Sequence, residues 1–115
     1  ALILICQTFI KPGNSVVAPV PTYEHFCCNA VHAGGNLIRL ELDNVLKPSI
    51  AEIKKSIETE KPSVVYLVSP NNPVGTHWDP PSMRDLASTY PDTIFIVDEA
   101  YHEFAKIDEE TKKPL

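Results

Sequence analysis

The chain has 115 residues, 43% of them hydrophobic and 22% charged, a composition typical of a globular protein with one core. Its net charge is −5 and its Lys and Arg residues form no block, which argues against nucleic acid or an anionic membrane as a partner. No apolar run approaches the roughly 18 residues that a membrane-spanning helix needs. Three cysteines, an odd number with an adjacent pair, make a poor disulfide framework and predict reduced thiols in a cytoplasmic compartment.

The first half of the chain predicts a helix, a strand, a second helix and a second strand. The opening ALILICQTFI is apolar but has no basic leader and no small-residue cleavage site, so it indicates the last turns of a helix rather than a signal peptide. A short strand is predicted at 15–18, and a helix at 22–33 that stops at Gly34-Gly35. Residues 36–42 alternate between apolar and polar side chains, which predicts a strand with one wetter face.

The second half continues the alternation. Residues 49–57 carry apolar side chains at i, i+3 and i+7 and predict a helix, and the almost continuous apolar run at 63–68 predicts a buried strand. A helix at 80–90 begins with proline, and a last strand follows at 93–97. The side chains expected on the buried side of this last helix are Met83, Leu86, Ala87 and Tyr90. Apolar strands joined by helices predict an α/β fold, a mostly parallel sheet with helices on both faces.

Two of the predicted strands are followed by residues that a simple turn does not require. Ligands of an open parallel sheet bind beyond the carboxyl ends of its strands. In PVPTYEHF, Tyr23 either covers the edge of the core or offers an aromatic face to a ligand. In SPNNPVGT, a turn needs only one asparagine before Pro73, so the amide of Asn72 either belongs to the turn or binds a ligand oxygen.

Asp98 directly follows the last predicted strand, in IVDEAYHEF. A carboxylate at the tip of a buried strand is costly unless it has a cationic partner or hydrogen bonds. Asp98 either caps a helix at 99–104 or binds a cationic ligand group.

Two patterns of metal-ligand residues carry little weight. His25, Cys28 and His32 recur on one helix face, but a fourth zinc ligand is not evident. Glu99 and His102 match half of a di-iron helix motif, whose second copy and four-helix bundle are missing from the sequence. We therefore predict no metal site.

Taken in order, PGNSVVAPVPTYEHF, YLVSPNNPVGT and FIVDEAYHEF resemble the large domain of class I/II aminotransferases, which are fold-type-I pyridoxal phosphate (PLP) enzymes. The likeness is greatest to the histidinol-phosphate aminotransferase branch and extends from about residue 1 to residue 104. In this family a Schiff-base lysine follows the D-E-A-Y motif by a few dozen residues, and Lys106 lies too close to Asp98 to replace it. Residues 1–115 are therefore expected to be the central part of such a domain, without its N-terminal part or its lysine region, and inactive as a transaminase by themselves.

The resemblance implies roles for four residues. Tyr23 would stack on the pyridine ring of PLP and, together with Asp98, act in catalysis. Asn72 and Tyr101 would donate hydrogen bonds to the phenolic oxygen of the ring. Asp98 would pair with the protonated ring nitrogen, because a nearby opposite charge favours protonation. Val74 stands where the family usually has threonine, a departure that we expect to be tolerated because that side chain is not the main ligand.

The resemblance also implies an activity: transfer of an amino group between an amino acid or amine, with histidinol phosphate as a candidate, and a 2-oxo acid. The expected full-length protein is a cytoplasmic homodimer. Related PLP enzymes share these motifs and stay alternatives, among them threonine-phosphate decarboxylases and aromatic aminotransferases. A non-catalytic α/β module, in which the same residues only form caps and turns, is a further alternative.

Overall fold

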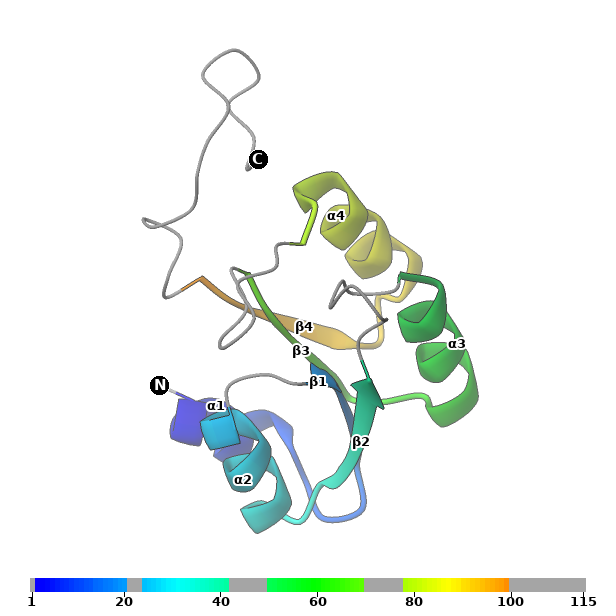
Figure 1. Cartoon of the computed structure of the whole chain (residues 1–115). Coiled ribbons are helices and arrows are strands. Elements are labelled where there is room, and N and C mark those ends of the chain that lie inside the picture. The colour runs from blue at the N-terminus through cyan, green and yellow to red at the C-terminus, as the bar shows by residue number, and fades with distance from the viewer. Residues whose placement is uncertain (1, 21–23, 42–49, 70–77, 100–115) are drawn as a thin grey trace.

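The structure is a computed structural model, and it describes residues 2–20, 24–41, 50–69 and 78–99. Helices and strands alternate along these ranges (Figure 1). In chain order the elements are α1 (Leu2–Phe9), β1 (Ser15–Val20), α2 (Glu24–His32), β2 (Asn36–Glu41), α3 (Ile50–Glu60), β3 (Val64–Val68), α4 (Pro80–Thr89) and β4 (Ile94–Asp98).

The four strands form one sheet with the order β2-β1-β3-β4, and all neighbouring pairs are parallel. Every residue of β3 is buried, whereas β2 and β4, at the two edges of the described sheet, are partly exposed. Helices α1 and α2 lie on one face of the sheet, and α3 and α4 lie on the other (Figure 1). The predicted fold class, a parallel α/β sheet with helices on both faces, is confirmed.

The side chains of β3 divide between two cores. Because successive strand residues point to opposite faces, Val64, Tyr66 and Val68 pack with α1 and α2, while Val65 and Leu67 pack with α3 and α4. A strand covered on both faces needs apolar side chains at every position, which explains the continuous apolar run in the sequence.

The glycine pair after α2 ends the helix as the sequence predicts. Gly34 has a φ of +90°, and its N–H donates to the carbonyl of Val31, while the N–H of Gly35 donates to that of Ala30. These two bonds form the Schellman motif, which favours glycine at the left-handed position. A Cβ on Gly35 would lie 2.9 Å from the carbonyl oxygen of Ala30 and 2.9 Å from a methyl group of Ile10.

Several strand and helix boundaries and two burial predictions differ from expectation. β4 is Ile94–Asp98 and not 93–97, so Asp98 is the last residue of the strand, and this strand at the edge of the described sheet is partly exposed and not buried. β1 extends beyond the predicted 15–18 to Val20, because it pairs with β2 along its whole length. Its proline is tolerated because β1 pairs with β3 only at Val16 and Val17. α3 continues past 57 to Glu60. The prediction that Ala87 faces the core is wrong: it is exposed, since it is rotated by roughly 100° from the buried Leu86.

Candidate active site

The carboxyl ends of three neighbouring strands meet at one edge of the sheet. β1, β3 and β4 are adjacent in the sheet, and each precedes one of the three segments singled out in the sequence. The chain leaves β1 through α2 on one face and reaches β3 through α3 on the opposite face, so the strand order reverses at the β1–β3 pair. Ligands of open parallel sheets bind at such a switch point.

Of the four residues predicted for the site, Asp98 is described by the structure. Tyr23, Asn72 and Tyr101 lie outside the described residues, as does most of the helix 99–104 that Asp98 was alternatively expected to cap. The geometry of the site is therefore built from Asp98 and from the residues that hold the ends of the three strands.

Asp98 is the last residue of β4 and pairs with Val68 of β3. Its side chain is partly buried, and its Oδ2 accepts a hydrogen bond of 2.8 Å from the hydroxyl of Tyr66. Tyr66 precedes Val68 by two residues and therefore faces the same side of the sheet, so the hydroxyl reaches Asp98 diagonally across the strand pair. The carboxylate at this edge of the sheet is thus bound to a phenol from the core.

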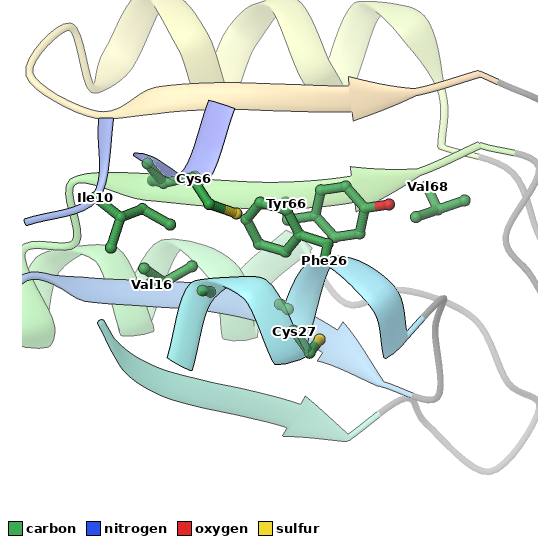
Figure 2. Packing of buried hydrophobic residues seen from close by; sticks show 10 residues of the cluster. Cys6, Ile10, Val16, Phe26, Cys27, Tyr66 and Val68 are labelled. Atoms are coloured by element: carbon green, nitrogen blue, oxygen red, sulfur yellow. The ribbon is translucent and has the colours of Figure 1, made fainter. Parts of the chain in front are cut away.

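The sequence did not predict Tyr66 as a residue near the site, because it lies in VVYLV, where it looks like one more buried side chain of a strand. The residue is 0% exposed, and its ring stacks on that of Phe26 from α2, with centroids 4.0 Å apart and 12° between the planes. Figure 2 shows its hydroxyl directed along β3 toward Val68, at the carboxyl end of the strand. The one clue in the sequence was a tyrosine in an otherwise aliphatic buried strand, since a buried hydroxyl needs a hydrogen-bond partner.

Ser69 and Trp78 lie on either side of the segment 70–77, which contains Asn72. The N–H of Ser69 donates to the carbonyl of Asp98 at 2.9 Å, and its Oγ accepts from the N–H of Trp78 at 3.0 Å. Both residues are buried, with 8% and 4% exposure, and Trp78 packs with the core under α3 and α4. One serine therefore ties the start of this segment to its end and to the strand that carries Asp98.

Thiols and charges elsewhere on the described residues do not form a second site. Burial, together with the nearby Glu24 carboxylate, raises the pKa of the Cys27 thiol to about 11, while Cys28 is exposed. Glu24 forms an exposed ion pair with Arg39. Within the described ranges, no three His, Cys, Asp or Glu side chains gather where they could hold a metal ion. The helices of the same ranges include none that is long and apolar enough to cross a membrane.

These features define an α/β domain that carries a hydrogen-bonded carboxylate at the carboxyl edge of a parallel sheet, the edge where ligands of such sheets bind. The family model for aminotransferase class I and II matches residues 1–112, and the chain belongs to this family. The family resemblance inferred from the three ordered motifs is thereby confirmed.

Individual relatives agree with this assignment. The chain is 36% identical over 111 residues to a histidinol-phosphate aminotransferase of Methanothermobacter thermautotrophicus, and 31% identical over 104 residues to one of Ruminiclostridium cellulolyticum. Each alignment covers 89% of this chain but only 27% and 29% of the relative, so the chain spans under a third of their length. The crystal structure of histidinol-phosphate aminotransferase from Sinorhizobium meliloti, in complex with pyridoxal-5'-phosphate, superposes with a TM-score of 0.84 at 25% identity. That match covers 98% of this chain and 30% of the Sinorhizobium chain.

Proposed function

We propose that the natural protein carrying this sequence is a PLP-dependent aminotransferase, and that residues 1–115 are the central part of its PLP-binding large domain. The observation that carries the proposal is the carboxylate of Asp98, held by Tyr66 at the carboxyl end of β4. Membership of the aminotransferase family and the position of Asp98 at the ligand-binding edge of the sheet support it.

The described residues fit a pyridine cofactor. An ionised carboxylate has about four lone-pair sites, so a bond from the Tyr66 hydroxyl is compatible with another from a protonated ring nitrogen. Burial strengthens such a charge-assisted bond, because the local dielectric constant is lower than that of water. Asp98 would therefore bind the cationic end of the ring and keep its proton in place.

The remaining proposed roles follow the family motifs. Tyr23 would pack on the ring face and exclude water from it, and Asn72 and Tyr101 would donate hydrogen bonds to the ring's phenolic oxygen. PLP, when bound, supplies an electron sink for negative charge at the α-carbon of the substrate. Asp98 would contribute by favouring the protonated form of the ring nitrogen, which would deepen that sink.

We propose histidinol phosphate as the amino donor and 2-oxoglutarate as the acceptor. The names of the two relatives and of the Sinorhizobium structure support histidinol phosphate as the donor. The three cysteines are free thiols, which supports a cytoplasmic location, and the proposed assembly is a homodimer.

A titration of the full-length natural protein with PLP tests the proposal. Binding should produce a visible absorbance band that shifts with pH and disappears on borohydride reduction, which fixes the cofactor covalently to the protein. The protein should also transfer the amino group of histidinol phosphate to 2-oxoglutarate. Release of carbon dioxide from an amino-acid phosphate instead would identify the decarboxylase alternative. If PLP produces no band, the proposed function is wrong.

The variant Asp98→Asn tests the role that we propose for the carboxylate. It keeps the side-chain shape and removes the charge, so the affinity for PLP should fall by roughly 10- to 100-fold, the range expected for a charge-assisted hydrogen bond. Asp92→Asn, at an exposed position in the turn before β4, is the control and should bind PLP like the parent. Equal affinities of the two variants, or loss of stability as the main effect of Asp98→Asn, would favour a purely structural carboxylate.

A further inference from the structure

The Asp98 side chain accepts a hydrogen bond of 2.8 Å from the hydroxyl of Tyr66, a residue of the buried core. We propose that Tyr66 is a positioning residue: its hydroxyl holds the Asp98 carboxylate in the orientation that receives the ring nitrogen of PLP. This inference rests on the proposed function and assigns a role to a residue outside the three sequence motifs.

The sheet fixes the distance between the two groups. Val68 pairs with Asp98 across the β3–β4 ladder, and Tyr66 lies two residues earlier on the same face. The backbone of this corner is held further by the bond from the N–H of Ser69 to the carbonyl of Asp98. The backbone that carries the phenol is therefore held in place by the sheet, and the 2.8 Å hydrogen bond from its hydroxyl restricts rotation of the Asp98 carboxylate.

The ring of Tyr66 is held in place by a side chain of α2. Phe26 of α2 stacks on it at 4.0 Å, nearly parallel, and both residues are fully buried (Figure 2). An immobilised ring gives its hydroxyl one direction, toward the carboxyl end of β3. A helix, a central strand and the next strand thus act together on one carboxylate oxygen.

A role in core packing alone does not account for this hydroxyl. Phenylalanine would fill the same volume and stack equally well on Phe26, without a polar atom to satisfy in the core. The hydroxyl is satisfied by the one carboxylate that ends β4, at the edge where ligands of such sheets bind. The oxygen of Tyr66 is therefore assigned to the site and its ring to the core.

The chain contains a matched control. Tyr90 donates a hydrogen bond of 2.7 Å from its hydroxyl to Glu58 on α3, another phenol–carboxylate pair, but one that is exposed and packs beside the α3–α4 core. Tyr66→Phe and Tyr90→Phe remove the same atom from the same kind of pair. Only the first change touches the proposed cofactor site.

The experiment measures PLP binding to the full-length apo protein in five forms: parent, Tyr66→Phe, Tyr90→Phe, Asp98→Asn and the double variant Tyr66→Phe/Asp98→Asn. Tyr66→Phe should weaken PLP binding about tenfold, corresponding to the loss of one hydrogen bond to a charged group, while Tyr90→Phe leaves it unchanged. In the Asp98→Asn background Tyr66→Phe should have no further effect, because the tyrosine acts through the carboxylate. With PLP labelled by ¹⁵N in the ring, the nitrogen resonance should move toward its unprotonated value in Tyr66→Phe.

The outcomes separate the inference from the proposed function. If the parent does not bind PLP, both are overturned. If the parent binds and Asp98→Asn weakens binding, but Tyr66→Phe behaves like Tyr90→Phe in affinity and ¹⁵N shift, the inference alone is overturned. Should Tyr66→Phe fail to fold, 3-fluorotyrosine introduced at position 66 keeps the hydroxyl. Its ¹⁹F resonance should then respond to PLP in the parent and not in Asp98→Asn, and an equal response in both would refute the inference.

Discussion

Ser69→Ala tests the anchoring of the segment that carries Asn72. The change removes the oxygen that accepts the N–H of Trp78 at 3.0 Å, in a region where both residues are at most 8% exposed. A buried donor left without an acceptor costs about 1–3 kcal/mol. Because the bond joins the two ends of the segment 70–77, we expect the loss to appear first as local opening of this segment rather than as global unfolding.

Hydrogen exchange at the backbone amide of Trp78 is the direct assay. A loss of about 1–3 kcal/mol corresponds to exchange that is roughly 5- to 150-fold faster, since 1.4 kcal/mol is a factor of ten. Ser69→Thr keeps the oxygen and should retain most of the protection, and Ser88→Ala, an exposed serine on α4, should leave it unchanged. Unaltered exchange at Trp78 in Ser69→Ala would show that the hydroxyl does not hold this segment, and the reasoning would be refuted.

Two further predictions concern the core under α1 and α2. Burial raises the pKa of the Cys27 thiol from 9.0 to about 11, so the unfolded chain loses this proton at a lower pH than the folded chain. The protonated thiol therefore contributes its full share to stability below pH 9, and this contribution is lost as the pH rises through 11. Denaturant titrations at a series of pH values should show that the free energy of unfolding falls by roughly 2–3 kcal/mol between pH 9 and pH 11, and that this fall is absent in Cys27→Ala. The same dependence of the free energy of unfolding on pH in both proteins would contradict the prediction. Gly35→Ala places a Cβ 2.9 Å from the Ala30 carbonyl oxygen and should lower the free energy of unfolding by about 1–3 kcal/mol. Thermal denaturation measures this loss. The control is Ala87→Gly at an exposed position of α4, for which we expect a loss of about 1 kcal/mol from helix propensity alone.

The layered α/β fold could be predicted from the sequence because its determinants are local. The apolar run of β3 reflects burial on both faces, and the N–H groups of Gly34 and Gly35 end α2 through bonds to carbonyls within five residues. Periodicity misplaced Ala87, because the width of the buried stripe on α4 depends on the sheet beneath it. The strand order depends on contacts between distant segments, and no local pattern encoded it.

The same distinction applies to the candidate site. Asp98 could be found because a carboxylate directly after an apolar run of residues conflicts with the burial that the run predicts. Tyr66 could not be found in this way, since it lies 32 positions earlier and meets Asp98 only through the register that pairs Val68 with Asp98. Residues that bind a ligand stand out by their chemistry, whereas residues that hold them in place are identified only when the strands are assembled.

The pair formed by Tyr66 and Asp98 also answers why the strand ends in a charge. The hydroxyl of Tyr66 offsets part of the cost of removing the Asp98 carboxylate from water. Replacing both partners of a buried polar pair by apolar groups of similar shape is often nearly neutral for stability, so stability alone gives no reason to keep this pair. A cationic ligand at the same edge would add an opposite charge beside Asp98, and the hydroxyl would keep the carboxylate oriented before that ligand arrives. The arrangement of this corner is compatible with preorganisation for a cation, which is the property that the proposed cofactor would require.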